Sequence, residues 1–373
     1  MPSASAMPSP SAAPATPAPP PKTIQFSGYA AAAYEHFGTS SNLGYRVFDT
    51  HPEAFNLQAV NIKTVITLPA GLGITAESVF GTDADGLASN GTSKTDGFDL
   101  PQAYVSYNKG GFTLIAGRFA SLAGAEVFQD PTDYEFSRSF LYGYAEPFTH
   151  TGVRATYAFD GGKYTLNAGA NNGWDDIKFV GKKKTFEFGP TIVISPAFTL
   201  AASTYNGQDF TNNYAGGAIR NNGDVGERAL YDFVLTSKAT PSLTFVSNYD
   251  NGNQQNVLQR DTQGATILDQ NASPLLGSGH FTGFSQIANY QYNAKFGLAL
   301  RGEVFHDGAG SRLSGPDQFL REGTATIAYT PSTPLLFRVE YRVDGSNQNT
   351  FATTQGGFVK HQNSVAVETA VKF

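Results

Sequence analysis

The chain has 373 residues, a formal net charge of −6 and no cysteine. The lack of cysteine excludes disulfide frameworks, iron–sulfur clusters and cysteine-bearing zinc sites, and no basic stripe marks nucleic acid as a partner. Only 15% of the residues are charged, whereas 29 are Phe and 18 are Tyr. This balance favours strands whose apolar face is turned toward something other than water.

The N-terminal residues 1–23 are rich in Pro, Ala and Ser, and we expect them to form a disordered segment before a barrel over 24–373. They have no charged stretch followed by an apolar run, so this sequence shows no signal peptide. No run of 18 or more apolar residues occurs in the chain. A membrane-spanning unit would therefore have to be a β-barrel.

From Ile24 onward the sequence repeats one unit, in which about ten residues of alternating polarity precede a turn signal. Seven very short connections, rich in Gly, Pro, Asn or Asp, lie around Pro69, Gly110, Gly161, Pro196, Pro241, Asn293 and Pro331. Eight longer polar connections alternate with them, over 38–53, 83–96, 119–150, 172–183, 207–226, 252–280, 307–317 and 346–356. This alternation predicts an all-β fold, an antiparallel up-and-down transmembrane β-barrel of about 16 strands. Short periplasmic turns and both termini would lie at one rim, and long external loops at the other.

The two faces of each strand can be assigned where the alternation is clear. In 335–344, Leu335, Phe337, Val339, Tyr341 and Val343 share one face, and Arg338, Glu340, Arg342 and Asp344 share the other. In a barrel the polar face lines the lumen, and we expect its wall to include Lys63, Arg154, Arg301, Glu303, Arg338, Glu340 and Arg342. A soluble β-sandwich binding protein would instead bury the apolar faces in its core. The unbroken hairpin array, the loop alternation and the C-terminus favour the barrel.

The last strand places Val367, Thr369, Val371 and Phe373 on one face, with Glu368 and Lys372 on the other. Outer-membrane barrels as a class commonly end on such a strand with a terminal aromatic residue, and the barrel assembly machinery reads it. By this likeness we interpret these four residues as a C-terminal assembly signal. Phe373 should face lipid at the short-turn rim.

Three stretches carry a family resemblance: FDLPQAYVSYN at 98–108, GFTLIAGRFASLAGAE at 111–126 and YEFSRSFLYGYAEPFTHTGVRATYAF at 134–159. They resemble the OmpL-like β-barrel porin family of bacterial outer-membrane proteins, most recognisably in the Ser-Arg-Ser segment at 137–139 and the Pro-Phe-Thr-His-Thr-Gly segment at 147–152. The resemblance covers 26–373 in architecture and is specific over 98–175. It implies a porin of the bacterial outer membrane, surrounded by lipid. General porins are usually homotrimers, so a homotrimer is the expected assembly.

The connection 119–150, between the fifth and sixth predicted strands, is the longest and least polar. Its apolar residues are Phe119, Leu122, Val127, Phe128, Phe136, Phe140, Leu141 and Tyr142. Because an exposed loop would not tolerate this content, we expect the connection to fold into the lumen, as the constriction loop of general porins does. On that analogy Glu126, Asp130, Asp133 and Glu135 would narrow the pore opposite Arg154, Arg301, Arg338 and Arg342, and the resulting field would orient solutes. Alternatively, Arg138 and these acids pin the loop to the wall through salt bridges.

These features predict a water-filled channel for passive diffusion of small hydrophilic solutes or ions, with no catalytic, cofactor or metal site. The six histidines show no metal-ligand spacing, and DADG at 83–86 begins like a calcium loop but lacks its final Glu. The alternative is an outer-membrane barrel enzyme of the phospholipase or protease type. Its one local candidate is the cluster of His306, Asp307 and Ser311.

Overall fold

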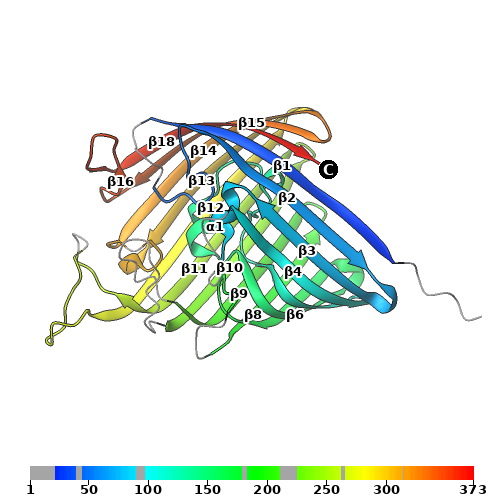
Figure 1. The fold of residues 1–373 in the computed structure, drawn as a ribbon, viewed down its shortest axis with the longest axis horizontal. Coiled ribbons are helices and arrows are strands. Elements are labelled where there is room, and N and C mark those ends of the chain that lie inside the picture. Colours follow the sequence, from blue (N-terminus) through cyan, green and yellow to red (C-terminus); the bar gives the residue numbers. More distant parts are fainter. Residues whose placement is uncertain are drawn as a thin grey trace, which may run out of the picture.

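The computed structural model describes residues 22–38, 44–89, 97–178, 183–210, 225–261, 265–313 and 315–373. In these ranges sixteen antiparallel strands form one closed barrel, and the strands run obliquely around it (Figure 1). The barrel strands are β1 (Thr23–Phe37), β2 (Phe55–Thr67), β3 (Leu72–Phe80), β4 (Phe98–Lys109), β5 (Phe112–Ala120), β6 (Thr149–Phe159), β7 (Tyr164–Asn171), β8 (Thr185–Ser195), β9 (Phe198–Phe210), β10 (Val225–Thr240), β11 (Leu243–Leu258), β12 (Leu276–Gln291), β13 (Phe296–Asp307), β14 (Gln318–Ser332), β15 (Leu335–Ser346) and β18 (His361–Lys372).

The remaining elements are small and belong to the connections. A hairpin of β16 (Phe351–Ala352) and β17 (Phe358–Val359) lies between β15 and β18, and a short helix α1 (Thr82–Leu87) follows β3. Single helical turns occur at Pro69–Gly71, Asp130–Thr132, Leu141–Ala145, Asp160–Gly162 and Gly308–Gly310. No helix within the described ranges is long and apolar enough to cross a membrane.

The predicted barrel and its strand order are confirmed. Each strand pairs with its sequence neighbour, and β1 pairs with β18 to close the ring. The connections are shorter than expected at 252–280, because β11 continues to Leu258 and β12 begins at Leu276. A closed ring with its charged faces inside excludes the β-sandwich alternative. The predicted disordered segment 1–23 falls almost wholly outside the described residues, and its last residue, Thr23, already begins β1.

The strand faces follow the predicted period of two. On β15, Phe337 and Val339 are 40% and 51% exposed on the outer surface, whereas Arg338 and Arg342 are 1% and 0% exposed inside. The same split separates Leu300 from Arg301 on β13 and Val153 from Arg154 on β6. The outer surface is thus a continuous apolar band, and the lumen holds the charged side chains.

The C-terminus closes the barrel against β1. The backbone N–H of Gly28 donates to the carbonyl oxygen of Phe373 at 3.0 Å, and the N–H of Phe373 donates back at 2.9 Å. The Phe373 ring covers Gly28 so closely that a Cβ at position 28 would lie 2.8 Å from the ring's Cζ. The N–H of Lys372 also bonds the carbonyl oxygen of Pro334, in the β14–β15 turn, so the chain ends at the short-turn rim as predicted. Glu368 is buried inside the barrel, whereas Phe373 is exposed on the outer side.

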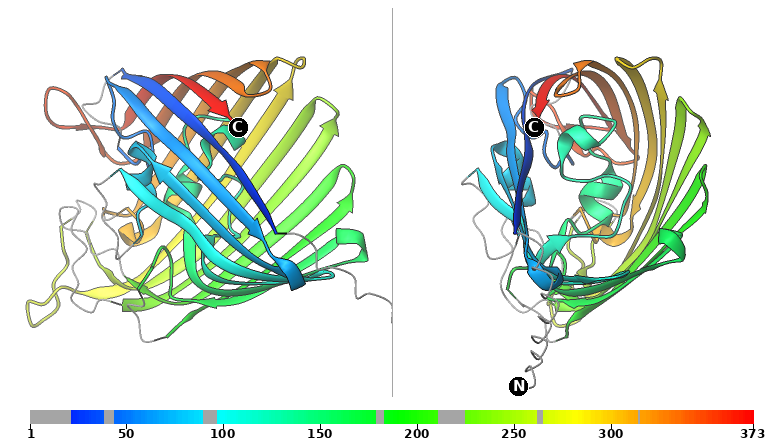
Figure 2. Two further views of the ribbon diagram at one scale, coloured as in Figure 1. Left: turned by 45° about the vertical axis from the view of Figure 1, so that its right-hand side comes forward. Right: turned by 90° about the vertical axis from the view of Figure 1, so that its right-hand side faces the viewer.

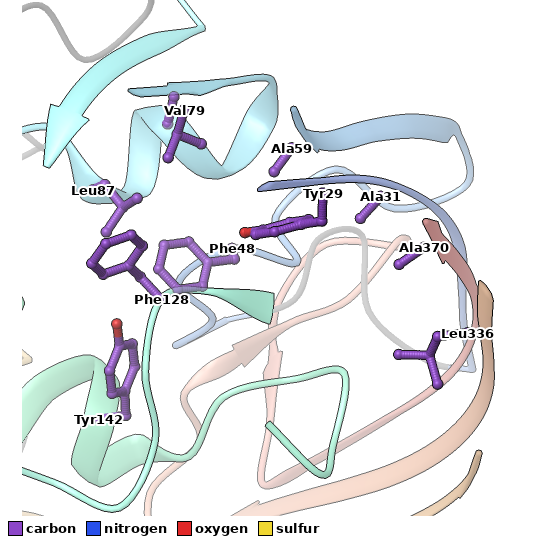
Figure 3. Packing of buried hydrophobic residues seen from close by; sticks show 11 residues of the cluster. Tyr29, Ala31, Phe48, Ala59, Val79, Leu87, Phe128, Tyr142, Leu336 and Ala370 are labelled. Carbon is purple, nitrogen blue, oxygen red and sulfur yellow. The ribbon is translucent and has the colours of Figure 1, made fainter. Parts of the chain in front are cut away.

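Three connections pack together inside the barrel, not one. The right-hand view of Figure 2 shows the green-cyan segment between β5 and β6 within the ring of strands. Its Phe128 and Tyr142 form an apolar cluster with Phe48, from the β1–β2 connection, and Leu87 of α1 (Figure 3). The connections 38–53 and 83–96, expected as external loops, thus also send side chains inward: Phe48 and Leu87 are buried against this segment, whereas Thr50, His51 and Glu53 are exposed.

Candidate functional site

The segment 121–148 between β5 and β6, which we call the inner loop, is held by two wall carboxylates that accept backbone hydrogen bonds. Glu303 accepts from the N–H groups of Phe140 and Leu141 at 2.7 and 2.6 Å. Glu340 accepts from Phe136 at 2.7 Å and from Ser137 at 3.0 Å. Charge-assisted bonds of this kind are among the stronger ones in proteins. Glu303 of β13 and Glu340 of β15 thus direct their carboxylates at the inner loop.

Arg301 of β13 joins the inner loop to the barrel wall through both its charge and its hydrogen bonds. Its Nη1 donates to Glu126 Oε1 at 2.7 Å and to the carbonyl oxygen of Ser137 at 2.8 Å. Its Nε donates to Glu322 Oε2, on the neighbouring strand β14, at 3.0 Å. The Arg301 side chain is completely buried. Arg301 and Glu126 are thus in direct contact and do not face one another across open water.

A second group of ion pairs holds the first half of the inner loop. Arg338 of β15 donates to Asp130 Oδ2 at 2.8 Å and also pairs with Glu368 of β18. Within the loop, Arg138 contacts Asp130 at 3.2 Å and Asp133 at 2.9 Å. These contacts place two predicted loop acids against cations, one from the wall and one from the loop itself.

Arg342 completes the contact between β15 and the inner loop. Its Nη1 donates to the carbonyl oxygen of Arg138 at 2.5 Å, and its Nε donates to Asp344 Oδ1 at 2.7 Å. Its guanidinium also lies 5.0 Å from the centre of the Phe140 ring. The buried Arg342 thus holds the inner loop by a hydrogen bond to its backbone and by a cation–π contact with one of its rings.

Glu135 differs from the other loop acids because neither of its oxygens has a hydrogen-bond partner, although the residue is 0% exposed. Burial, with repulsion from Glu126 and Glu340, raises the pKa of Glu135 to about 8 despite the attraction of Arg301. Burial also raises the pKa of Asp133 to about 7, against the lowering effect of Arg138. Glu135 is therefore protonated in large part at neutral pH.

Two predicted wall cations do not contact the inner-loop acids. Arg154 of β6 pairs with Glu187 of β8, at 2.6 Å and 3.0 Å, and donates to the carbonyl oxygen of Ala120. Lys63 of β2 lies 3.7 Å from Glu77, and its side chain is 36% exposed. Among the predicted wall cations, Lys63 is thus the one that water reaches most readily.

The inner loop also touches the opposite side of the barrel. Gln129 donates to Glu77 of β3 at 2.9 Å, and the N–H of Leu122 donates to the hydroxyl of Tyr205, on β9, at 2.8 Å. The N–H of Ala125 donates to Asn248 Oδ1, on β11, at 2.7 Å. A segment that contacts β3, β9, β11, β13 and β15 crosses the lumen from side to side.

Nearer the short-turn rim, the lumen face of β6 to β12 carries mostly uncharged polar side chains, apart from Lys238, which lies opposite Thr244 in the β10–β11 register. It carries hydroxyl and amide side chains on the strand faces that also carry Arg154, Glu187 and Asn248. These residues are Thr156, Asn167, Thr191, Thr199, Thr236, Thr244 and Asn289, and several pair across neighbouring strands. Such groups hydrogen-bond to water and to polar solutes without attracting ions strongly.

Sequence reasoning missed several charged residues that hold the interior. Arg46, in the β1–β2 connection, pairs with Asp49 and with Asp344 of β15. Arg118 of β5 pairs with Asp99 of β4 at 2.8 Å. Glu187 could have been found, because it alternates with Phe186 and Phe188 in the sequence. Arg46 carried no periodic signal, since it lies outside any strand.

The suspected catalytic cluster does not assemble. Ser311 Oγ donates to Asp307 Oδ1 at 2.9 Å, but His306 Nε2 lies 3.1 Å from Asp317 and its ring stacks on Phe319. His306 and Asp307 are consecutive on β13, so their side chains point to opposite sides of the barrel wall.

Comparison with known proteins agrees with this geometry. Residues 23–373 match the family described as beta-barrel porin-2, OmpL-like, which confirms the expected resemblance. None of the curated proteins matches the sequence.

Similar folds occur in several solved outer-membrane proteins. The outer membrane channel DcaP of Acinetobacter baumannii has a TM-score of 0.65 at 14% identity, over 94% of this chain and 97% of that one. The anion-selective porin from Comamonas acidovorans has a TM-score of 0.62 at 13% identity, over 95% and 100% of the two chains. The trimer form of OmpT from Vibrio cholerae has a TM-score of 0.62 at 12% identity, over 94% and 99%. These likenesses show the fold, and the family match over nearly the whole chain shows more: the chain belongs to the OmpL-like family of β-barrel porins and forms a passive diffusion channel of the outer membrane.

Proposed function

We propose that the inner loop forms the constriction of this porin and that the constriction selects small hydrophilic solutes mainly by size. The observation that carries the proposal is the direct pairing of the mid-lumen charges. Glu126 pairs with Arg301, Asp130 with Arg338 and Asp133 with Arg138. Paired and buried charges produce a weak field in the pore, so this arrangement favours pinning of the loop over orientation of solutes by an open transverse field.

The accessible polar surface supports the same solute class. Threonine and asparagine side chains line the lumen toward the short-turn rim, and Lys63 is the accessible cation of the predicted wall set. We therefore expect weak ion selectivity that depends on Lys63 more than on the buried pairs.

Planar-bilayer recording of the detergent-folded protein tests this function. We expect stepwise, ohmic conductance, and a reversal potential near zero in a salt gradient. Lys63→Gln should shift the reversal potential toward cation preference, whereas Lys163→Gln, at the β6–β7 turn, is the matched control and should not. Lack of any conductance would refute the channel, and a strong selectivity that Lys63→Gln leaves unchanged would refute selection mainly by size.

We further infer that the barrel has no catalytic role. The separation of His306 from Ser311 supports this, because a nucleophile and its base must lie within hydrogen-bond reach. An assay with phospholipid and peptide substrates checks it: turnover that His306→Ala abolishes would contradict the inference.

We also infer that Val367, Thr369, Val371 and Phe373 act as the signal read by the barrel assembly machinery. Val367, Thr369 and Val371 are exposed on the outer face of β18, and Phe373 is exposed directly after it, so another protein can reach all four. Outer-membrane lipid then covers this apolar surface in the assembled protein. Electrophoresis of the unheated protein after assembly in cells measures how much barrel forms.

A homotrimer is the proposed assembly, and the trimer form of Vibrio cholerae OmpT supports it by similarity of fold alone. Chemical cross-linking of the detergent-extracted protein tests this. If cross-linking gave only a band of one chain, the trimer would be contradicted, whereas the proposed channel function would still stand.

A further inference from the structure

Three carboxylates meet where the end of the inner loop contacts the barrel wall. They belong to Glu146 of the inner loop, Asp232 of β10 and Asp250 of β11, and one oxygen of each lies within 4.8 Å of the other two. The residues are 3%, 1% and 0% exposed. Asp232 and Asp250 face each other directly in the β10–β11 register, so two neighbouring strands present both carboxylates to the same point.

Among the residues that the structure describes, this cluster has no cationic partner. No Lys or Arg in the described ranges forms an ion pair with Glu146, Asp232 or Asp250, in contrast to Glu126, Asp130 and Asp133 of the inner loop. No N–H group or hydroxyl in the described ranges donates to either oxygen of Asp250 or to Oε2 of Glu146, so these oxygens have only the carboxyl groups of the cluster beside them. Buried carboxylates without partners are costly, and they are usually paired with a cation, neutralised by a proton or bound to a metal ion.

The surroundings hold the carboxylates in place. Asp232 accepts hydrogen bonds from Asn248 Nδ2 at 3.0 Å and from Ser203 Oγ at 3.1 Å. The same Asn248 accepts from the N–H of Ala125 in the inner loop, so the amide connects the loop, the wall and the cluster. Such outer contacts are what orient metal-binding carboxylates in known sites.

Gly124 makes room for the third carboxylate. Its φ of +92° is one that residues with a side chain rarely adopt, and a Cβ there would lie 1.8 Å from Glu146 Oε2. Glu146 therefore reaches the cluster only because residue 124 is glycine. The backbone of the inner loop is thus fitted to this arrangement of acids.

We propose that Glu146, Asp232 and Asp250 bind one divalent cation of the calcium class, which fastens the end of the inner loop to β10 and β11. The ligands are all carboxylate oxygens, which hard cations prefer, and calcium takes such oxygens at about 2.3–2.6 Å in flexible geometry. Two oxygens on opposite sides of one such ion are about 5 Å apart, which agrees with the spacing of the cluster. Magnesium, which usually keeps several waters, suits a dry site with three protein carboxylates less well. The sequence pattern did not predict this site because its three residues come from separate segments.

Calorimetric titration with calcium chloride tests the proposal. The detergent-folded barrel is first treated with a chelator and dialysed, and its unfolding temperature is measured with and without calcium. We expect one calcium ion per chain and a higher unfolding temperature with calcium, since a ligand that binds only the folded state stabilises it. Glu146→Gln and Asp250→Asn should each weaken binding by tenfold or more.

Asp83→Asn is the matched control, because Asp83 of α1 is also buried and has an unpartnered oxygen but does not belong to the cluster. It should bind calcium as the wild type does. Electrophoresis of unheated samples shows whether each variant has folded; if Asp250→Asn does not fold, Glu146→Gln still tests the site, because Glu146 lies outside the strands. An unchanged unfolding temperature and no heat of binding in the wild type would overturn the proposal, as would equal affinity in wild type and Glu146→Gln. If the three carboxyl groups share protons and bind no metal, calcium should give no heat of binding and should leave the unfolding temperature unchanged.

Discussion

Replacement of Arg301 by methionine should release the inner loop from β13. Arg301→Met keeps much of the side-chain length but removes the bonds to Glu126, Glu322 and the carbonyl oxygen of Ser137. Glu126 and Glu322 then remain buried with their main cation gone. The inner loop would be expected to leave the wall so that Glu126 can reach water.

The size of the effect follows from the burial of the pair. Removal of one partner of a fully buried ion pair costs about 3–5 kcal/mol, because the other charge is left unpaired. Since about 1.4 kcal/mol changes an equilibrium constant tenfold, the ratio of released to docked loop should rise by roughly 10²–10⁴. A loop that is released for even a small fraction of the time produces visible current fluctuations.

Single-channel recording measures this change. We expect Arg301→Met to give a larger mean conductance and more frequent current steps than the wild type. The double variant Arg301→Met/Glu126→Gln should show fewer current steps than Arg301→Met alone, because it removes the unpaired charge of Glu126 as well as that of Arg301. If Arg301→Met conducts with wild-type amplitude and noise, the inner loop does not depend on this pair and the reasoning is wrong.

Three further predictions concern the loop and the terminus. Phe373→Ser removes the ring that covers Gly28, so less heat-modifiable barrel should form in cells than with Phe358→Ser, which removes a similarly exposed ring from the β16–β17 hairpin; equal yields would contradict the assembly signal. The pKa of Glu135, raised by burial from 4.5 to about 8, means that the docked loop takes up a proton. Docking should therefore weaken as pH rises from about 4.5 to about 8, and current noise should rise with it. Glu135→Gln should remove this pH dependence, and a variant that keeps it would show that another group titrates. Gly124→Ala places a methyl group 1.8 Å from Glu146 Oε2, and we expect more current steps at unchanged barrel yield; noise at the wild-type level would show that the site adapts.

The features that the sequence predicted well are local ones. A period of two decides at once that Arg338 faces the lumen and Val339 faces lipid, because neighbouring side chains on a strand must point to opposite sides. Turn residues such as Gly110 are also a local signal, because tight reversals of the chain need residues that adopt a positive φ. Strand count, topology and the inner loop's apolar content therefore followed from short stretches of sequence.

The features that the sequence did not predict depend on contacts between distant segments. Glu340 accepts from the backbone of Phe136, 204 residues away, and no pattern in either stretch specifies the other. Phe48 is one of a few apolar residues in a mostly polar connection, so its burial against Tyr142 carried no periodic signal. Whether an acid faces water or an arginine likewise depends on how the inner loop folds. The sequence alone therefore could not decide whether the inner-loop acids create a field across the pore or form salt bridges with the wall.

The closure of β1 on β18 has a consequence for the order of synthesis. Residues 29–37 at the start of the barrel pair with 364–372 at its end, so the ring stays open until the last residues of the chain exist. A polypeptide that stops before β18 exposes two edges, on β1 and β15, where the backbone donors and acceptors that would pair with β18 have no partner. Such edges readily join other strands, which makes an incomplete chain prone to aggregate. Only a chain that includes β18 can pair both edges and close the ring, so barrel closure itself depends on complete synthesis of β18.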